Sequence, residues 1–494
     1  MSSSKINNTL FLIFGQGINF LFNLLMLPIL VRALPLDDYA SYSQILLITS
    51  TLYPIISLGI GNGMIVFFNE DRRHNFNVVL NGITGVFVIS LLAYLFLYFS
   101  STQLITIFKN ELIWHYLSFF FFSIILQIIS DLFFNFLIFI EKSKTASFLV
   151  VLNNLLRLGA MFLAIYFTKD IYYIFLFQMI AQAIGILVYF GIIYFNFVKD
   201  LFFRYDFDLN KKMIGVSVPL ALTSIVGVLL IQTDGFIINT FLGKFDFAYY
   251  RSGAIEIPFL STIYASISLI FLPEFKKLVT RKDWPEIIQL KRKLILNSAI
   301  ITYPFILLAI FFGKNLIIWY LGSNFTQSAS IFIIYNLILF IRVNDYSDIL
   351  ILHKKSSLIL IIYLVSFFIN LILSLILVNM IGIIGPLIAT VFSIFVIASL
   401  QLRYTSKILN TNVFYFANLY KVLGVLIFDI AVINICYAAF YFFPVNKLIE
   451  IAVTGVCFIS LHFYMMYKLR LIDQSIVDKV KFVIQKYGIR KFFL

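Results

Sequence analysis

Long uninterrupted apolar segments dominate this chain and restrict its fold more than any other feature. About fourteen runs of roughly 20 or more apolar residues follow one another along its 494 residues. Each residue of an α-helix rises about 1.5 Å, so a helix of this length crosses the hydrocarbon core of a bilayer. Because 62% of the residues are hydrophobic and only 12% are charged, the chain would aggregate in water. The sequence predicts an all-α integral membrane protein.

The connections between the runs are short, and none leaves room for a sizeable soluble domain. The first run is too long for the apolar region of a cleaved signal peptide, so we expect it to remain as a span. The predicted spans cover residues 8–30, 41–68, 77–99, 112–140, 146–167, 171–196, 213–241, 247–272, 293–313, 326–352, 357–379, 383–402, 414–441 and 447–467.

Basic residues are divided unequally between the two sets of loops. With fourteen spans, both termini and every second loop share one side of the membrane, and this side holds 27 of the 37 Lys and Arg residues. The opposite loops hold 6. The positive-inside rule therefore predicts that both termini are cytoplasmic. The net charge of +14 is explained by topology and by contact with anionic membrane lipids, so no nucleic-acid partner is expected.

A short motif occurs twice, each time at the turn between two spans. Residues 34–42 (LPLDDYASY) and 242–250 (LGKFDFAYY) both read L-x-x-x-D-[YF]-A-x-Y, 208 residues apart. A second pair, EKSK at 141–144 and HKKS at 353–356, is separated by 212 residues. Both offsets predict two parallel six-span repeats, as in transporters whose two lobes rock around a central cavity. We expect the repeated hairpins to form structural turns at the outer rim.

The repeat also sets the predicted domain limits. Two pseudo-symmetric six-helix lobes are joined by a basic linker and followed by two additional helices, and the carboxy-terminal segment has the pattern of a basic amphipathic helix on the inner leaflet. A disordered tail is the alternative for that segment. The limits are 1–197 for the N-lobe, 198–212 for the cytoplasmic linker, 213–405 for the C-lobe, 406–470 for the two last spans and 471–494 for the tail.

Several arginines lie inside predicted spans, where a charge is costly and usually marks a polar lumen. Arg157 follows Lys144 by 13 residues, about 20 Å along a helix, too deep to reach the inner face easily. Arg342 lies in the tenth span, and Arg251 lies near the outer edge of the eighth, where it could extend to the surface. A guanidinium binds phosphate oxygens bidentately, so these three residues predict a cavity for an anionic amphiphile. A structural salt bridge is the alternative for Arg157.

Buried carboxylates form a second group of candidates. Asp131, Asp234 and Glu256 lie deep in their spans and could bind a proton or a cation that drives transport. In the tenth span, Arg342, Asp345 and Asp348 recur every three residues and would share one helical stripe. An internal Arg–Asp pair and a cavity group that exchanges its partner both explain this stripe, and Asp345 is the candidate for ion coupling there.

No constellation for bond chemistry is visible in the sequence. The four His residues are scattered, the two Cys residues fall inside late spans, and no phosphate-binding loop G-x-x-x-x-G-K-[ST] occurs. We expect no metal site, no cofactor and no enzymatic activity, and we expect an ion gradient or the membrane potential to supply the energy.

Two stretches resemble known patterns. G-x-G-x-N at 15–19, followed by LPILVRAL at 27–34, resembles the amino-terminal pattern of bacterial polysaccharide flippases, and DGFII at 234–238 resembles their seventh span. These flippases form the polysaccharide-transporter branch of the MATE-like MOP superfamily. The resemblance implies alternating access that moves an undecaprenyl-pyrophosphate-linked oligosaccharide between leaflets. It also implies the bacterial inner membrane, headgroup contacts by Arg157, Arg342 and Arg251, and a polysaccharide polymerase and a chain-length regulator as partners.

The sequence thus predicts a flippase for an O-antigen or capsule repeat unit. A peptidoglycan precursor and teichoic acid remain as alternative cargoes. The alternatives in function are a MATE-type cation-coupled drug exporter, which would favour buried carboxylates over deep arginines, and a membrane polysaccharide polymerase, which usually carries a long outer loop. No outer loop here exceeds roughly a dozen residues.

Overall fold

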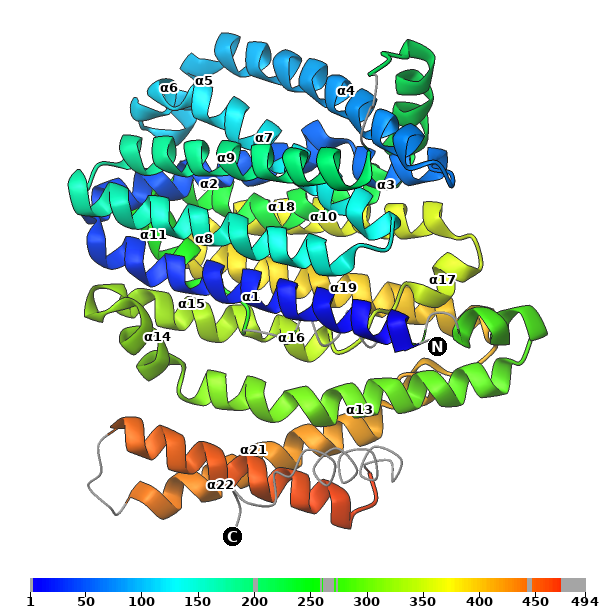
Figure 1. Ribbon diagram of the computed structural model, residues 1–494. Helices are drawn as coiled ribbons and strands as arrows, with labels where there is room; N and C mark the ends of the chain where they lie inside the picture. Colours follow the sequence, from blue (N-terminus) through cyan, green and yellow to red (C-terminus); the bar gives the residue numbers. More distant parts are fainter. Residues whose placement is uncertain are drawn as a thin grey trace. The chain divides into compact units, whose positions relative to one another are not determined.

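The computed structural model describes residues 3–198, 203–257, 260, 271, 274–441 and 447–471, and its ribbon is helical with no strand in these residues (Figure 1). The predicted all-α fold is therefore confirmed. The helices are α1 Ser3–Ala33, α2 Leu36–Ser57, α3 Ile60–Gly63, α4 Arg72–Phe99, α5 Ser101–Phe108, α6 Leu112–His115, α7 Leu117–Phe139, α8 Ser143–Phe167, α9 Ile171–Phe197, α10 Phe207–Phe241, α11 Lys244–Gly253, α13 Trp284–Phe311, α14 Gly313–Leu321, α15 Thr326–Asn336, α16 Ile338–Ile341, α17 Asp348–Leu352, α18 Ser356–Ile381, α19 Ile384–Ile408, α20 Val413–Phe416, α21 Leu419–Tyr441 and α22 Lys447–Lys468.

Twelve helices of the described residues are long and apolar enough to cross a membrane. They match twelve of the predicted spans, and α1 covers a thirteenth, 8–30. Half of the remaining predicted span, 247–272, lies outside the described residues; in the described half, α11 ends at Gly253 and residues 254–257 are not helical. The predicted amphipathic tail at 471–494 lies outside the described residues apart from its first residue. The multi-pass membrane character is therefore confirmed.

Capping side chains explain where many of these helices begin. Asp71, Asp170, Asp206 and Asp283 each accept a hydrogen bond from a backbone N–H of the first turn, at the starts of α4, α9, α10 and α13. Each such cap satisfies an N–H that has no partner within the helix and stabilises the helix by about 1 kcal/mol. The short polar loops thus set the helix limits between apolar runs.

The chain divides into two compact units. Unit 1 comprises residues 1–254, 320–331 and 357–393, and unit 2 comprises residues 255–319, 332–356 and 394–494.

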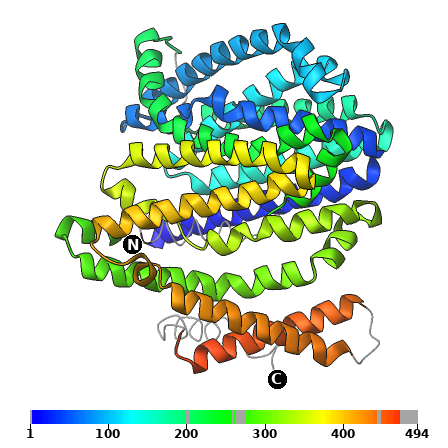
Figure 2. The ribbon, with the colours of Figure 1, turned by 180° about the vertical axis from the view of Figure 1, so that it is seen from behind.

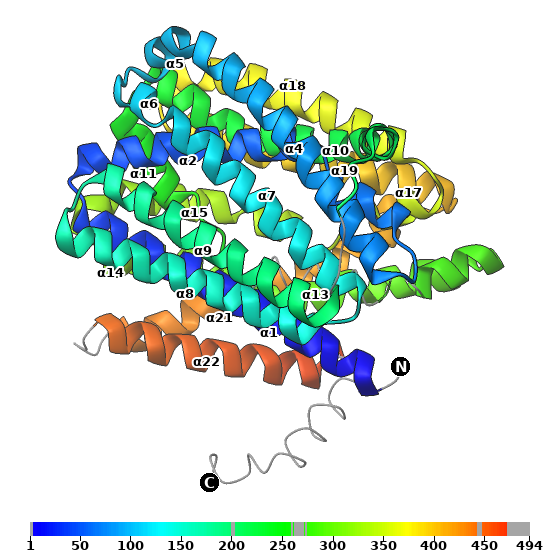
Figure 3. The same ribbon diagram turned by 45° about the horizontal axis from the view of Figure 1, so that its top comes forward.

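In unit 1, α7 lies between α4 and α9 (Figure 3), and α8 packs between α1 and α9. Buried apolar side chains of α4, α7 and α9, among them Phe76, Phe136 and Tyr189, form its core. Gly15 lets α1 approach α8 closely, since a Cβ at this position would lie 2.8 Å from the Cβ of Ser147. A small cavity opens beside this close approach of α1 and α8.

The two copies of the repeated motif lie against each other in unit 1. They form the starts of α2 and α11, which pack side by side. Lys244 of the second copy forms a 2.5 Å ion pair with Asp37 of the first. Tyr39 shares a 2.7 Å hydrogen bond with Ser252, the residue two positions past the second copy. The duplicated turns are thus a packed contact as well as hairpins.

Unit 2 is built around α13, which packs against α16, α20, α21 and α22. Helices α21 and α22 lie side by side at the carboxy-terminal end of the described chain (Figure 2). The buried apolar cluster of unit 2 includes Phe275, Ile295, Tyr303 and Phe416.

The predicted tenth span, 326–352, is not one helix. Helix α16 ends at Ile341, residues 342–347 are not helical, and α17 begins at Asp348. The prediction that Arg342, Asp345 and Asp348 share one helical stripe is therefore wrong. The physical reason is a side chain from another helix: the ammonium of Lys291, which is only 1% exposed, binds Asn344, Asp345 and Asp348 and holds the segment in its non-helical form.

Candidate functional site

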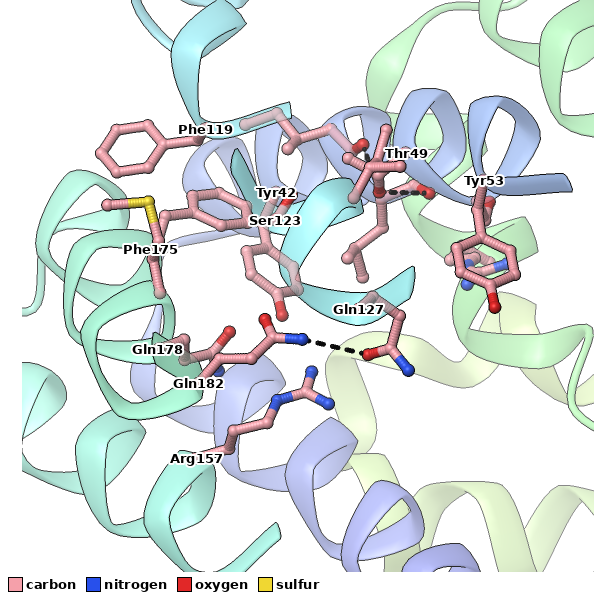
Figure 4. Close-up of a pocket in the computed structure, with 16 residues that line it drawn as sticks. Tyr42, Thr49, Tyr53, Phe119, Ser123, Gln127, Arg157, Phe175, Gln178 and Gln182 are labelled. Atoms are coloured by element: carbon pink, nitrogen blue, oxygen red, sulfur yellow. Dashed lines mark hydrogen bonds between the residues drawn. The ribbon is translucent and has the colours of Figure 1, made fainter. Parts of the chain in front are cut away.

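A cavity of unit 1 lies among α2, α7, α8, α9 and α11 and encloses about 250 Å³ (Figure 4). Its wall combines two arginines, three glutamines and several hydroxyl groups with apolar and aromatic side chains. The lining residues are Tyr42, Ile45, Leu46, Thr49, Ser50, Tyr53, Phe119, Ser123, Ile124, Gln127, Arg157, Phe175, Gln178, Met179, Gln182 and Arg251. We refer to it as the arginine cavity.

Arg157 extends from α8 toward Gln127 and Gln182 (Figure 4). Its Nε atom is buried without a hydrogen-bond partner in the described residues, and so is Nε2 of Gln178. Gln182 donates to the carbonyl oxygen of the Gln127 side chain at 3.2 Å. The predicted deep arginine therefore lines a cavity and carries an N–H that the described residues do not satisfy.

The electrostatic character of this cavity is one-sided. Arg157 and Arg251 both line it, and none of the residues that form its wall in the described chain is acidic. Neither arginine takes part in any ion pair found within the described part of the chain. Two guanidinium groups without a carboxylate, surrounded by apolar walls, create a site that favours a bound anion.

Aromatic rings form the side of the cavity nearest α9. Tyr42 stacks on Phe175 with 4.9 Å between ring centroids and an interplanar angle of 21°. Phe119 also packs close to Phe175. Tyr42 is the last residue of the first repeated motif, so the expectation that these hairpins are only turns is incomplete: one of their side chains reaches the cavity wall.

Tyr250 occupies the same position in the second motif and leads to a different polar group. Its hydroxyl donates to Asp234 at 3.0 Å, and Thr390 donates to the other carboxylate oxygen at 2.8 Å. Asn370 in turn donates to Thr390 at 2.6 Å. Asp234 is fully buried, and both of these donors to its carboxylate are neutral hydroxyl groups. The repeat thus places one tyrosine beside a cation and its counterpart beside an anion.

Two of the predicted residues of unit 2, Arg342 and Glu256, form an ion pair with each other. Arg342 donates to Glu256 at 2.8 Å, and their side chains are 46% and 24% exposed. Asp345 accepts hydrogen bonds from the backbone and side chain of Ser347. Arg342 is therefore engaged by a carboxylate, in contrast with Arg157 and Arg251.

Sequence reasoning missed the amide side chains of the arginine cavity and two buried ion pairs. Glutamine in an apolar span is a signal that could have found Gln127, Gln178 and Gln182, because an unpaired amide is costly in a membrane. The pairs Lys291–Asp348 and His462–Asp429 carried no comparable signal. Their partners come from different helices, 57 and 33 residues apart in sequence.

The helical multi-pass fold is that of the MOP superfamily of transporters. A multidrug-resistance MATE family transporter of that superfamily, in an inward-facing conformation, aligns with a TM-score of 0.65 and 11% identity over 79% of this chain and 94% of its own. The lipid II flippase MurJ, inward closed, aligns with a TM-score of 0.64 and 15% identity over 94% of this chain and 100% of its own. A MOP superfamily transporter from Pyrococcus furiosus aligns with a TM-score of 0.53 and 11% identity over 82% and 95%.

A sequence family can be assigned as well. The family model described as polysaccharide biosynthesis protein matches residues 6–279, more than half of the chain, and the chain belongs to this family. No individual curated protein matches the sequence significantly.

Proposed function

We propose that this protein is a flippase that moves an undecaprenyl-pyrophosphate-linked oligosaccharide, an O-antigen or capsule repeat unit, from the cytoplasmic to the outer leaflet of the bacterial inner membrane. The observation that carries the proposal is the arginine cavity, whose two guanidinium groups have no acidic neighbour in the cavity wall. A pyrophosphate diester carries two negative charges, and the planar guanidinium fork of arginine binds pairs of its oxygens bidentately, which the ammonium of lysine does not. Relocating such a headgroup breaks no covalent bond, so the proposed activity is transport and not catalysis.

The rest of the cavity wall suits a sugar attached to that pyrophosphate. Glutamine amides offer donors and acceptors for sugar hydroxyls, and the flat ring of Phe175 offers an apolar face. The family description and the fold shared with a lipid II flippase agree with this cargo class. We propose that the two lobes, 1–197 and 213–405, alternate access to the two sides of the membrane and that both termini are cytoplasmic. We further propose that a polysaccharide polymerase and a chain-length regulator use the units that this protein delivers.

Asp234 is our candidate for the coupling-ion site of this transporter. It is fully buried, and its carboxylate oxygens accept from the hydroxyls of Tyr250 and Thr390. A carboxylate that has neutral donors only can gain or lose a single positive charge during a transport cycle. Glu256 is a weaker candidate because Arg342 already neutralises its charge. Asp345 is also a weaker candidate, because its carboxylate already accepts hydrogen bonds from the backbone N–H and the hydroxyl of Ser347.

A MATE-type exporter of cationic compounds is the second candidate function, and the half-buried carboxylate of Asp131 and the fully buried one of Asp234 favour it. The two proposals differ in what they predict for the arginine variants: loss of transport for a flippase and retained transport for an exporter. Under the flippase proposal, Arg157→Ala and Arg251→Ala lose surface polysaccharide by 10-fold or more at normal protein levels, since each removes a charge-assisted bond to the headgroup. The exposed Arg403→Ala is the matched control and keeps full surface polysaccharide.

The measurement is quantitative immunoblotting of surface polysaccharide and of the membrane-inserted protein in the same cells. Full activity of both cavity variants would exclude the arginine cavity as the headgroup site. Resistance to cationic dyes that is lost in Asp234→Asn and kept in Arg157→Ala would favour the exporter instead.

A further inference from the structure

Two of the predicted spans are interrupted by short non-helical segments. Residues 254–257, which follow α11, form the first break, and residues 342–347, which follow α16, form the second. Helix α11 begins at the predicted outer rim and contains 10 residues, a rise of about 15 Å or half of the hydrocarbon core. At this depth lipid offers no hydrogen bonds, so the backbone of the first break needs partners from the protein or from water.

Asn336, the last residue of α15, binds the backbone of the first break. Its amide donates to the carbonyl oxygen of Ile255 at 3.0 Å, and its Oδ1 accepts from the N–H of Ile257 at 2.9 Å. The amide also donates to the carbonyl oxygen of Phe332 on its own helix at 2.8 Å. Residue 258 is a proline, and the residue before a proline is disfavoured in the helical conformation. One side chain thus supplies the hydrogen bonds that a continuous helix would have made.

The residue between these two backbone contacts reaches the second break. Glu256 accepts from the guanidinium of Arg342 at 2.8 Å, and Arg342 is the first residue after α16. Three consecutive residues of the first break are therefore bound by the predicted span 326–352, two of them by Asn336 and one by Arg342. All of these residues belong to unit 2. The two breaks are thus joined to each other.

The contacts that hold the breaks differ in their access to water. Asn336 is fully buried, and so is Lys291, which binds Asp348 beyond the second break at 2.6 Å. Glu256 and Arg342 are exposed in comparison, with 24% and 46% of their side-chain surface open. An exposed ion pair contributes little to stability and opens at small cost, whereas a buried hydrogen bond that is broken leaves its groups without partners. The ion pair is therefore the contact that can open while the others persist.

We propose that the two breaks form one hinge, in which Asn336 is the permanent joint and the Glu256–Arg342 ion pair opens and closes as the two spans bend. Hinges consist of a few residues at helix ends that absorb a change in backbone angles. Because Asn336 ties the breaks together, both spans bend at the same level. This inference goes beyond the proposed function, since it concerns movement and applies to any cargo, and it assigns Arg342 to the hinge and not to a headgroup.

The first test is hydrogen exchange, measured by mass spectrometry on the purified full-length protein in detergent, and it requires no cargo. Asn336→Leu removes the joint, so the backbone amides of both breaks should exchange about 10-fold faster or more. Arg342→Met removes only the ion pair and should leave exchange in the first break within about 2-fold of the wild type. Asn434→Leu replaces an exposed asparagine of α21 and should change neither break.

The second test asks whether the ion pair opens during transport. Glu256→Cys and Arg342→Cys are combined in a chain whose two native cysteines are alanine, and the new cysteines are joined by a short bis-methanethiosulfonate linker. Transport, followed as surface polysaccharide or as dye resistance, should persist in the unlinked variant, because Asn336 still joins the breaks. The short linker should abolish transport, and its removal by dithiothreitol should restore it. A long flexible linker between the same cysteines is the matched control and should permit transport.

The outcomes separate the hinge from the proposed function. Faster exchange in the first break alone would show that the two breaks are independent and would overturn the hinge. Transport that continues under the short linker, or that is lost in the unlinked variant, overturns the ion pair as the contact that opens. A wild type with neither surface polysaccharide nor dye resistance counts against the proposed function, and the hydrogen-exchange test then decides on the hinge by itself. The linker test does not use Asn336→Leu and stays decisive where that variant fails to fold.

Discussion

Two cations, the partly buried Arg157 in unit 1 and the fully buried Lys291 in unit 2, have opposite surroundings. The Lys291 ammonium lies 2.6 Å from Asn344 Oδ1 and 2.6 Å from Asp348 Oδ2, also donates to the Asp345 carbonyl, and lies over the ring of Phe275. Arg157 borders a cavity, and its Nε has no partner among the described residues. A charge that the protein satisfies fully stabilises the fold, whereas a charge left beside a cavity is available to a ligand.

The largest expected effect follows from removing the satisfied cation. Lys291→Met leaves the Asp348 carboxylate buried without its counter-ion, which costs about 3–5 kcal/mol, a large part of the stability of a typical domain. We expect little folded protein, measured by size-exclusion chromatography in detergent and by Tm. The double variant Lys291→Met with Asp348→Leu removes both charges and should recover most of the folded protein. Equal loss in both variants would show that Lys291 acts through something other than this pair.

His462 provides a second buried site, in which two hydrogen bonds join three helices. Its Nε2 lies 2.8 Å from the Ile300 carbonyl and must donate to it, and Nδ1 lies 2.5 Å from Asp429 Oδ1. That second bond requires one shared proton, whichever partner carries it. His462→Phe removes both bonds and should cost about 2–3 kcal/mol, visible as a lower Tm.

Asp429→Asn is the matched control for the histidine. The asparagine amide can donate to Nδ1 while the imidazole still donates to Ile300, so the Tm should stay close to that of the wild type. A fall as large as that of His462→Phe would contradict this description of the pair.

Removing Arg157, whose Nε has no partner among the described residues, should raise the stability of the protein and not lower it. Arg157→Met removes a guanidinium that the described residues leave partly unpaired and replaces it by an apolar side chain of similar length. We expect the stability to rise by about 0.5–2 kcal/mol while surface polysaccharide is lost, the usual exchange of stability against activity at a binding site. A Tm decrease in Arg157→Met would place Arg157 with Lys291 as a structural cation.

The comparison also explains which parts of this molecule the sequence could predict. Span limits depend on local composition, so twelve predicted spans recur as helices, and the depth of Arg157 follows from counting residues along one helix. Ion pairs between distant residues, by contrast, depend on which helices pack together, and this packing cannot be read from local composition. Lys291 falls in the loop between the predicted spans 247–272 and 293–313, yet it is buried, because Asp348 reaches it from another segment. The same contact of Lys291 with the segment around Asp348 explains why residues 342–347 do not form the predicted helix.

The smallest expected effect concerns the contact between the two copies of the repeated motif. Lys244 and Asp37 are 2.5 Å apart, but their side chains are 23% and 55% exposed, and ion pairs in such surroundings contribute about 0–1 kcal/mol. Lys244→Ala should therefore shift the Tm only slightly, and the shift should vanish in high salt. Tyr39→Phe removes the buried hydrogen bond to Ser252 and should cost more than the ion pair does, since Ser252 is fully buried. If Lys244→Ala proves the more damaging of the two, the exposed pair and not the buried hydroxyl holds the duplicated hairpins together.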